Sequence, residues 1–489
     1  MITAVMRIPA WIYIAILVVT GTLVRFINIT KASIWHDEGY TMMLAPMPFL
    51  EIIERTARDV HPPLYYLVLH GWMELFGSSE LAARSFSAIC LIAVIPLTYL
   101  LIRRLFTEHT ARVAALFVTL GPFIVRYSQE ARMYGMVALL LLVATYCLVR
   151  ATQGGGRRWW LLYAFAIAAS LYTHYYAIFM IVAHWVYMLF VTRKNHTGLK
   201  SRSWWGANVL AAILFLPWLP AAIGQFTRVQ GGFWIPETTS MTLPNTLMQL
   251  LVFSNGDVLG RMAKLGLAIG FIALTYGLWR HARRYRNSTL LLTLYALTAP
   301  LLVMALSLAR PIYVDRYFVF AAIGFYCLLA AIVVLGPPFA GRLRLQLVTV
   351  LIAVTAFGYG ISSVYQQANH QMRKVGAVVN EGFRNGDEVI SGELYTFFDF
   401  SYYNHTGEPT KLYAPNGVNG YGESSLIYDQ ADRLIIRDLS QIDPISGFVW
   451  VIGKSGNDKP YFDQVPPNWK IVGPKQVYRD SAVQKYRVE

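Results

Sequence analysis

Five short polar segments interrupt an otherwise apolar chain of 489 residues, and in them acids, arginines, histidines and tyrosines stand side by side. They are 35–40 (WHDEGY), 59–66 (DVHPPLYY), 126–134 (RYSQEARMY), 172–176 (YTHYY) and 310–317 (RPIYVDRY). The planar guanidinium of arginine matches phosphate oxygens, and a carboxylate can take a proton from an attacking hydroxyl. Tyrosine and tryptophan offer flat faces and polar edges to a sugar. This combination indicates group transfer from a phosphorylated, lipid-borne substrate.

The candidate catalytic residues are Asp37 and Glu38. The candidate substrate-binding residues all stand in these polar segments, next to apolar stretches: His61, Tyr65, Arg126, Gln129, Glu130, Arg132, Tyr134, His174, Arg310, Asp315, Arg316 and Tyr317. Arg126 or Arg132 is expected at the donor phosphate, and Glu130 at the sugar or the acceptor.

Each candidate also has a purely structural interpretation. An acid at position 37 or 38 stabilises a helix N-terminus, and His61-Pro62-Pro63 can simply fix a rigid turn into a helix. The charges of 126–132 can form an ion-pair network. His174 can be an interfacial residue among aromatic neighbours, and the arginines of 310–316 can snorkel at a helix end.

The elements that must position these residues are membrane-spanning helices. The chain is 56% hydrophobic and only 14% charged, with a mean hydropathy of +0.43; soluble domains carry about 25% charged residues. Apolar stretches long enough to cross a bilayer centre on eleven intervals: 9–28, 81–102, 111–125, 133–151, 159–176, 177–192, 205–222, 262–279, 289–308, 317–336 and 346–364. The three cysteines, Cys90, Cys147 and Cys327, all fall inside such stretches, so we expect buried thiols and no disulfide framework.

The net charge of +15 indicates topology and not a nucleic-acid partner. Arg7 and five segments (103–112, 150–158, 193–202, 280–286 and 342–344) hold 17 of the 42 lysines and arginines and a single acid, Glu108. With the N-terminus in the cytoplasm, all five segments fall inside, as the positive-inside rule requires. The polar segments with the candidate residues then face the opposite, extracytoplasmic side, in what we expect to be a bacterial inner membrane or another cell membrane.

We therefore expect a polytopic α-helical membrane domain over residues 1–365, with about eleven spans, the N-terminus inside and the C-terminus outside. Juxtamembrane helices are expected in the first outer loop. Residues 366–489 lack long apolar runs, and "GDEVISG", "RLIIRDL" and "GFVWVIG" have the pattern of short buried strands. A helix is expected over 375–383, in a small extracytoplasmic α/β domain. The segment 223–261 holds an apolar helical stretch, "LPNTLMQLLVF", which can be a lid or an interfacial helix.

Three of these motifs carry a family resemblance. "WHDEGYT", "HPPLYYLVLHGWMELFGSSELAARSFSAI" and "RYSQEARMYG" resemble the polytopic GT-C type glycosyltransferases that use polyprenyl-phosphate sugars, among them protein O-mannosyltransferases and the bacterial aminoarabinose transferase. The resemblance is strong over residues 10–180. From there to about residue 365 it is weaker and rests on the topology of the spans. The C-terminal domain contains no specific family signature. The resemblance implies a polyprenyl-phosphate sugar donor, a lipid bilayer as surroundings and a glycan, glycolipid or protein acceptor.

The resemblance also implies roles. The family's early acid corresponds to Asp37, with Glu38 beside it, and acts as general base on the acceptor hydroxyl. In-line attack at the anomeric carbon then inverts the sugar, and the polyprenyl phosphate leaves. Glu130 and Arg132 match the family's site in the second loop, and Arg316 with Tyr317 resembles its late substrate contact. Mannose or another hexose is the expected sugar, with a pentose or aminopentose as the nearest variant.

No obligatory cofactor is expected. Asp37 and Glu130 together can hold a divalent metal ion if folding joins them, but the arginines can neutralise the leaving phosphate without one. Two other classes stay open. A lipid-linked sugar transporter or flippase would show internal repeats and broken helices, and a non-catalytic membrane scaffold would not depend on Asp37.

Overall fold

A computed structural model describes residues 8–191, 199–228, 235–254, 260–336, 342–367, 370–417, 424–427, 430–455 and 465–489. Its contacts divide the chain into two compact units. Unit 1 comprises Met1–Ile27, Arg84–Pro220 and Phe233–Gln367. Unit 2 comprises Asn28–Ala83, Ala221–Gly232 and Ala368–Glu489. The two units separate at Gln367 and Ala368, close to the expected boundary near residue 365, but the first outer loop groups with the C-terminal residues.

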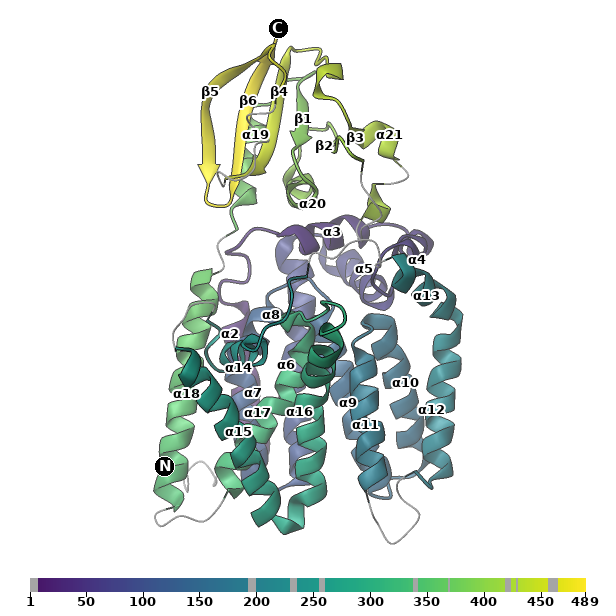
Figure 1. Ribbon diagram of the computed structural model, residues 1–489, viewed down its shortest axis with the longest axis vertical. Coiled ribbons are helices and arrows are strands. Elements are labelled where there is room, and N and C mark those ends of the chain that lie inside the picture. The colour runs from purple at the N-terminus through teal and green to yellow at the C-terminus, as the bar shows by residue number, and fades with distance from the viewer. Residues whose placement is uncertain are drawn as a thin grey trace. The chain divides into compact units, whose positions relative to one another are not determined.

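Unit 1 is a bundle of helices, and every one of the eleven apolar intervals falls on a helix (Figure 1). The helices are α2 (Ala10–Phe26), α6 (Glu80–Leu105), α7 (Glu108–Leu120), α8 (Pro122–Ser128), α9 (Tyr134–Thr152), α10 (Arg157–Thr173), α11 (Ala177–Phe190), α12 (Arg202–Phe215), α14 (Thr242–Val252), α15 (Arg261–His281), α16 (Arg286–Ser307), α17 (Val319–Leu335) and α18 (Arg342–Gln367). Helix α13 (Leu219–Arg228) belongs mostly to unit 2. Within the described ranges, seven helical stretches are long and apolar enough to cross a membrane, or eight if α7 and α8 form one span. The helices Ala10–Phe26 and Ala177–Phe190 are apolar but shorter.

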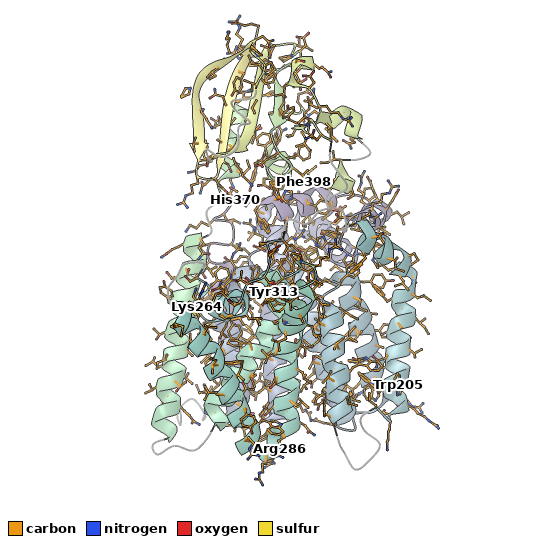
Figure 2. All side chains as sticks on the ribbon, viewed as in Figure 1. Trp205, Lys264, Arg286, Tyr313, His370 and Phe398 are labelled. Atoms are coloured by element: carbon orange, nitrogen blue, oxygen red, sulfur yellow. The ribbon has the colours of Figure 1, made fainter. Side chains whose placement is uncertain are left out.

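The basic segments gather at one end of this bundle. The connections α6–α7, α9–α10 and α15–α16 carry three of them, and residues of all three line one cavity. Figure 2 shows Arg286 at this end of the helices, whereas Lys264 and Tyr313 lie toward the other end. The polar connections α8–α9, α10–α11 and α16–α17 follow at the far ends of the same helices. These three basic connections and the polar connections of unit 1 therefore lie at opposite ends of the same helices.

A buried arginine stabilises the break between α7 and α8, which are bent by 49°. Pro122 has no N–H, so the Val118 carbonyl loses the partner that a continuous helix would supply. Arg25 of α2, with no exposed surface, donates from Nη2 to that carbonyl at 3.2 Å and from Nη1 to the Thr119 carbonyl at 3.1 Å. The bend brings the turn after α8, which carries the second group of candidate residues, against the end of α2.

Unit 2 begins with three helices of the first loop: α3 (His36–Leu44), α4 (Phe49–Arg58) and α5 (Leu64–Phe76). They are the helices expected in that loop. Pro62 and Pro63 directly precede α5, where a missing N–H costs nothing because the first turn has no intrahelical acceptor for it. Gln225 of α13 donates to the Thr56 carbonyl at 2.6 Å, which fixes the end of α4.

The rest of unit 2 is built on a six-stranded sheet in the order β3-β2-β1-β4-β6-β5. Its strands are β1 (Glu388–Ser391), β2 (Lys411–Tyr413), β3 (Ile435–Ile436), β4 (Phe448–Lys454), β5 (Trp469–Tyr478) and β6 (Ser481–Val488). The strands β1 to β4 are parallel, whereas β6 runs antiparallel to β4 and β5. Helix α19 (Met372–Gly382) precedes β1, helix α20 (Leu394–Tyr403) lies between β1 and β2, and helix α21 (Ala431–Leu434) lies between β2 and β3. The three predicted strands correspond to β1, β3 and β4, and the helix predicted over 375–383 is α19.

Candidate functional site

The acid pair of the first loop lies in the first turn of α3. There the unpaired backbone N–H groups of the helix favour negative charge. Asp37 is 8% exposed and Glu38 is fully buried. A helix of nine residues cannot bury two acids by itself, so its packing against the rest of unit 2 keeps them in place. Both acids thus stand in the first turn of α3, after its N-cap Trp35, and a catalytic role remains a prediction.

A second acid lies near the same helix. Asp59, 1% exposed, ends α4, and its Oδ2 is 3.6 Å from Nδ1 of His61. Burial, and after it the charge of Asp59, raises the pKa of Tyr40 on α3. The rings of Tyr40 and Tyr66 are 6.1 Å apart, and those of Tyr66 and the candidate Tyr65 are 5.5 Å apart. Tyr65 therefore belongs to one buried aromatic group with α3, and His61 lies beside Asp59 at the end of α4.

In unit 1, the turn after α8 carries an ion pair. Nη2 of Arg126 is 2.6 Å from Oε1 of Glu130, whose side chain is 4% exposed. Arg132 is 1% exposed, and its backbone N–H donates to the Glu130 carbonyl at 2.8 Å. Gln129 donates through its amide to the carbonyls of Arg25 and Ile27, at 3.0 and 2.8 Å, where α2 ends. Gln129 thus holds this turn on α2.

Aromatic rings from three helix connections meet beside this turn. The rings of Tyr134 and His174 are 6.2 Å apart, those of Tyr134 and Tyr317 6.0 Å, and those of His174 and Tyr317 4.8 Å. The guanidinium carbon of Arg316 lies 5.8 Å from the Tyr317 ring. Nδ1 of His174 accepts from the Tyr176 N–H at 3.1 Å, so a neutral His174 carries its proton on Nε2. His174 is 5% exposed and is not a residue at a free lipid interface.

The connection between α16 and α17 also holds helix α14. Thr246 of α14 donates to Oδ1 of Asp315 at 2.5 Å and lies 2.9 Å from the Tyr313 hydroxyl. Lys264 of α15 donates to Asn245 at 3.1 Å. The half-buried Arg310 follows α16 at the same end of the bundle. The stretch predicted as an apolar helix in the loop 223–261 is therefore α14, attached through Asp315; residues 229–234 and 255–259 of that loop lie outside the described ranges.

The candidates thus form two groups. Asp37, Glu38, His61 and Tyr65 belong to unit 2, and the members that belong to unit 1 are Arg126, Gln129, Glu130, Arg132, Tyr134, His174, Arg310, Asp315, Arg316 and Tyr317. The sequence analysis missed Asp59, although it stands two residues before His61. It also missed His370, Asp399 and Asp480 of the C-terminal segment, each an isolated polar residue that no motif distinguishes.

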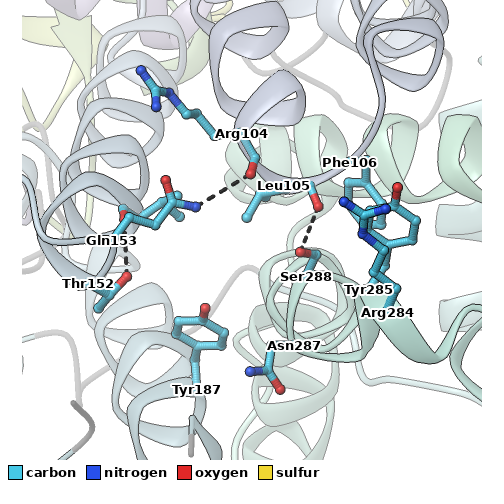
Figure 3. Close-up of a pocket in the computed structure, with 11 residues that line it drawn as sticks. Arg104, Leu105, Phe106, Thr152, Gln153, Tyr187, Arg284, Tyr285, Asn287 and Ser288 are labelled. Atoms are coloured by element: carbon cyan, nitrogen blue, oxygen red, sulfur yellow. Dashed lines mark hydrogen bonds between the residues drawn. The ribbon is translucent and has the colours of Figure 1, made fainter. Parts of the chain in front are cut away.

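A cavity at the basic end of the bundle holds none of the candidates. It has a volume of about 270 Å³ and lies between the ends of α6, α9, α11 and α16 (Figure 3). Its lining includes Arg104, Gln153, Tyr187, Arg284 and Asn287. Ser288 donates to the Leu105 carbonyl at 2.8 Å and closes one side.

In the part of the chain that the structure describes, no group of three or more histidines, cysteines, aspartates or glutamates is arranged to hold a metal ion. The three thiols are free and buried, as the sequence predicts.

Known proteins resemble this chain in sequence over a third of its length and in fold over nearly all of it. Residues 60–220 match the family model described as dolichyl-phosphate-mannose-protein mannosyltransferase. ArnT from Cupriavidus metallidurans in the apo state has a TM-score of 0.69 at 12% identity, over 97% of this chain and 98% of that chain. The same protein bound to undecaprenyl phosphate has a TM-score of 0.64 at 13% identity, over 98% of each chain. A comparison with the sequences of curated proteins gives no significant match.

A third structure is the archaeal oligosaccharyltransferase AglB from Archaeoglobus fulgidus, in complex with an inhibitory peptide and a dolichol-phosphate. It has a TM-score of 0.55 at 11% identity, over 90% of this chain and 69% of that chain. The motif resemblance to GT-C type glycosyltransferases is thereby confirmed, and the structural likeness shows a shared fold. The matched family segment begins at Val60 and includes His61, the ion pair of Arg126 with Glu130, and His174.

Proposed function

We propose that this protein is an integral membrane glycosyltransferase that moves a sugar from a polyprenyl-phosphate carrier to an acceptor hydroxyl on the extracytoplasmic face. The observation that carries the proposal is the coincidence of the family segment 60–220 with the cluster of Arg126, Glu130, Tyr134 and His174. Solved structures of the same fold contain undecaprenyl phosphate or dolichol-phosphate, and a lipid phosphate is the ligand that an arginine-rich, aromatic site favours.

In this proposal, the unit 1 group handles the donor. Arg126 and Arg316 come from two different helix connections, and each guanidinium lies over a tyrosine ring, Tyr127 or Tyr317. Such guanidinium groups can compensate the charge of a leaving phosphate as its bond to the sugar breaks. His174, whose Nδ1 accepts from the Tyr176 N–H, adds its Nε2–H as a further donor. The rings of Tyr134 and Tyr317 supply a surface on which a pyranose can stack.

The unit 2 group activates the acceptor. A base must reach the hydroxyl proton, and Asp37 keeps 8% of its surface exposed whereas Glu38 keeps none. Asp37 is therefore the general base, and Glu38 fixes the helix that carries it. Attack from the face opposite the phosphate inverts the anomeric carbon, so a β-linked donor gives an α-linked product. Mannose or another hexose is the proposed sugar.

The proposal is tested by incubating the purified protein with a panel of radiolabelled polyprenyl-phosphate monosaccharides and an envelope extract as acceptor. Release of polyprenyl phosphate from one donor is the expected result. Absence of release from every donor, by protein that is folded and reconstituted, would contradict the enzyme interpretation.

The Asp37→Asn substitution tests the base. It removes the proton acceptor while keeping the shape of the side chain, so we expect turnover to fall by about 10²–10⁴-fold with donor binding retained. Asp438→Asn, at an exposed site in the C-terminal segment, is the control and should leave turnover unchanged. If Asp37→Asn turns over at the wild-type rate, the hydroxyl proton goes elsewhere and the assignment is wrong.

A further inference from the structure

Helix α3, which carries the acid pair, is packed backbone to backbone on α20 of the C-terminal segment. A Cβ atom on Gly39 would lie 2.6 and 2.7 Å from the Phe398 carbonyl carbon and oxygen, and 2.9 Å from the Asp399 nitrogen. The His36 ring lies 4.6 Å from the Tyr395 ring and 5.4 Å from the Phe398 ring. At Gly39 the two helix backbones therefore meet without room for a side chain, so a shift of α20 at this point acts directly on α3.

A buried carboxyl group lies in this interface. Asp399 is 3% exposed, and its Oδ2 is 3.6 Å from Nε2 of His370. Its Oδ1 is buried and has no hydrogen-bond partner within the described chain. A buried oxygen without a partner is costly when it carries charge. Asp399 is therefore poorly suited to be a permanent carboxylate.

His370 links this carboxyl group to two other segments. Its Nδ1 pairs with Asp480 in the turn between β5 and β6, and its carbonyl accepts from the Ser33 N–H at 2.9 Å. Figure 2 labels His370 and Phe398, which lie near each other in unit 2. His370, which stands two residues before α19, thus joins the turn between β5 and β6 and the start of the first loop beside Asp399.

The charged groups that act on Asp399 are His370, His36, Asp37 and Asp480. Charges on the other neighbours of α20 are paired elsewhere: Arg373 of α19 with Glu80, Glu388 of β1 with Lys411 of β2, and Lys454 of β4 with Glu393. Burial raises the pKa of Asp399 to about 8, although the two histidines oppose the shift. Burial alone would lower the pKa of His370, but its hydrogen bond with Asp480 and the charge of Asp399 raise it.

We infer that Asp399 is a positioning residue for Asp37: in its neutral form it lets α3 dock on α20, and in its ionised form it loosens that docking. The inference rests on the proposed function for its activity readout only. Two carboxyl groups in one environment commonly separate into one that keeps its proton and one that ionises. Here the C-terminal segment supplies the proton-holding member, and the first loop supplies the base.

The direction of the pH dependence follows from linkage. The folded-state pKa of Asp399 is raised above its ordinary value of 3.8, so protonation stabilises the fold. That contribution is fully present below about pH 4 and is lost as the pH rises through about 8. The pKa of His370 is also raised, so protonation of His370 likewise stabilises the fold and this contribution is likewise lost as the pH rises. Loosening of α3 is therefore an alkaline effect.

The test compares wild-type protein, Asp399→Asn and Asp387→Asn, each as the full chain in liposomes. Asp387 is a matched control because it is also a buried aspartate of unit 2, but it binds Ser446, Trp450 and Lys485 within the sheet domain. Turnover is measured from about pH 6 to about pH 9 with the donor that the panel identifies.

Wild-type activity should fall through about pH 8. Asp399→Asn, which cannot ionise, should keep several-fold more of its neutral-pH activity on the alkaline side, whereas Asp387→Asn should keep the wild-type midpoint. If Asp399→Asn retains the wild-type alkaline limb, the inference is wrong.

A second measurement needs no donor. Hydrogen–deuterium exchange of the peptide that contains α3, corrected for the chemical exchange rate, should show protection falling above about pH 8 in the wild type and persisting in Asp399→Asn. Equal loss of protection in both proteins would overturn the inference. Protection that differs, in a protein that consumes no donor, would support this docking and would contradict only the proposed function. Donor turnover with the same pH profiles in the wild type and in Asp399→Asn would support the proposed function and contradict the role of Asp399 in this docking.

Discussion

At the scale of single residues, substitutions of Arg126 and Glu130 can distinguish a structural role of their ion pair from a role in catalysis. The pair joins atoms 2.6 Å apart, and the Arg126 side chain is 29% exposed. Arg126→Gln removes from the buried Glu130 carboxylate the charged partner that Arg126 supplies. We expect it to cost ~2 kcal/mol of stability, less than the ~3–5 kcal/mol of a fully buried pair, because water reaches the guanidinium.

The double variant Arg126→Gln/Glu130→Gln separates the two roles in a double-mutant cycle. Stability should recover in the double variant, since no unpaired charge remains, whereas donor turnover should not recover if either side chain contacts substrate. Thermal unfolding and lipid-donor turnover measure the two quantities. Recovery of turnover together with stability would mean that the pair is only structural.

The sequence identified residues that stand together in one short motif, but not a residue that matters through a contact with a distant part of the chain. Arg126, Glu130 and Tyr134 are recognisable in the sequence because they stand in one short polar stretch, 126–134. In the structure Arg126 pairs with Glu130, and the Tyr134 ring lies 6.2 Å from the His174 ring. Asp399 carries no such signal. It matters because α20 packs on α3, more than three hundred residues earlier in the chain, and a contact at that separation leaves no mark in a single sequence.

At the scale of elements, the α3–α20 contact predicts opposite outcomes for two glycines of the first loop. Gly39→Ala places a methyl group against backbone atoms, which cannot move as a side chain can. We expect it to cost about 1–3 kcal/mol and to lower turnover. Gly71→Ala, inside α5 with nothing within 4 Å, should be neutral or stabilise by up to about 1 kcal/mol. Unfolding of both purified variants checks this; equal effects would mean that α3 does not need its close approach to α20.

Apolar length was enough to predict helices but not to predict strands. Each of the eleven apolar intervals lies on a helix, because a lipid-facing backbone must satisfy its own hydrogen bonds. Strand β5 escaped prediction because nearly all its residues after Trp469 are exposed, so no alternation of apolar and polar residues marks it. Its register also shifts between Val472 and Gln476. Hydrogen bonds to β6 hold this strand, and composition does not record them.

At the scale of the whole molecule, the composition change near residue 365 predicted two consecutive domains, whereas the contacts join the first loop to the C-terminal segment. Glu80 explains why: it accepts hydrogen bonds from Arg373 at 2.6 Å and from the Tyr403 hydroxyl at 2.7 Å. The same hydroxyl accepts from the Ile34 N–H at 2.7 Å. The composition of the chain reflects which residues are suited to the membrane, whereas its division into compact units reflects such long-range contacts.

The orientation in the membrane is the last prediction, and the three buried thiols make it testable by labelling. Cys90, Cys147 and Cys327 are free but buried, so an impermeant maleimide should report only on cysteines that are introduced. Gln153→Cys lies at the basic end of the bundle, which the positive-inside rule assigns to the cytoplasm. Ile445→Cys lies in the C-terminal segment, where the side chain is 96% exposed.

In intact cells, the cysteine at position 445 should label and the one at position 153 should label only after permeabilisation. The wild type should remain unlabelled in both conditions, which controls for access to the native thiols. The physical reason is the cost of translocating three or more clustered arginines in short connections, which the cytoplasmic placement avoids. Labelling of position 153 from outside would reverse the sides, and with them the compartment in which Asp37 meets its acceptor.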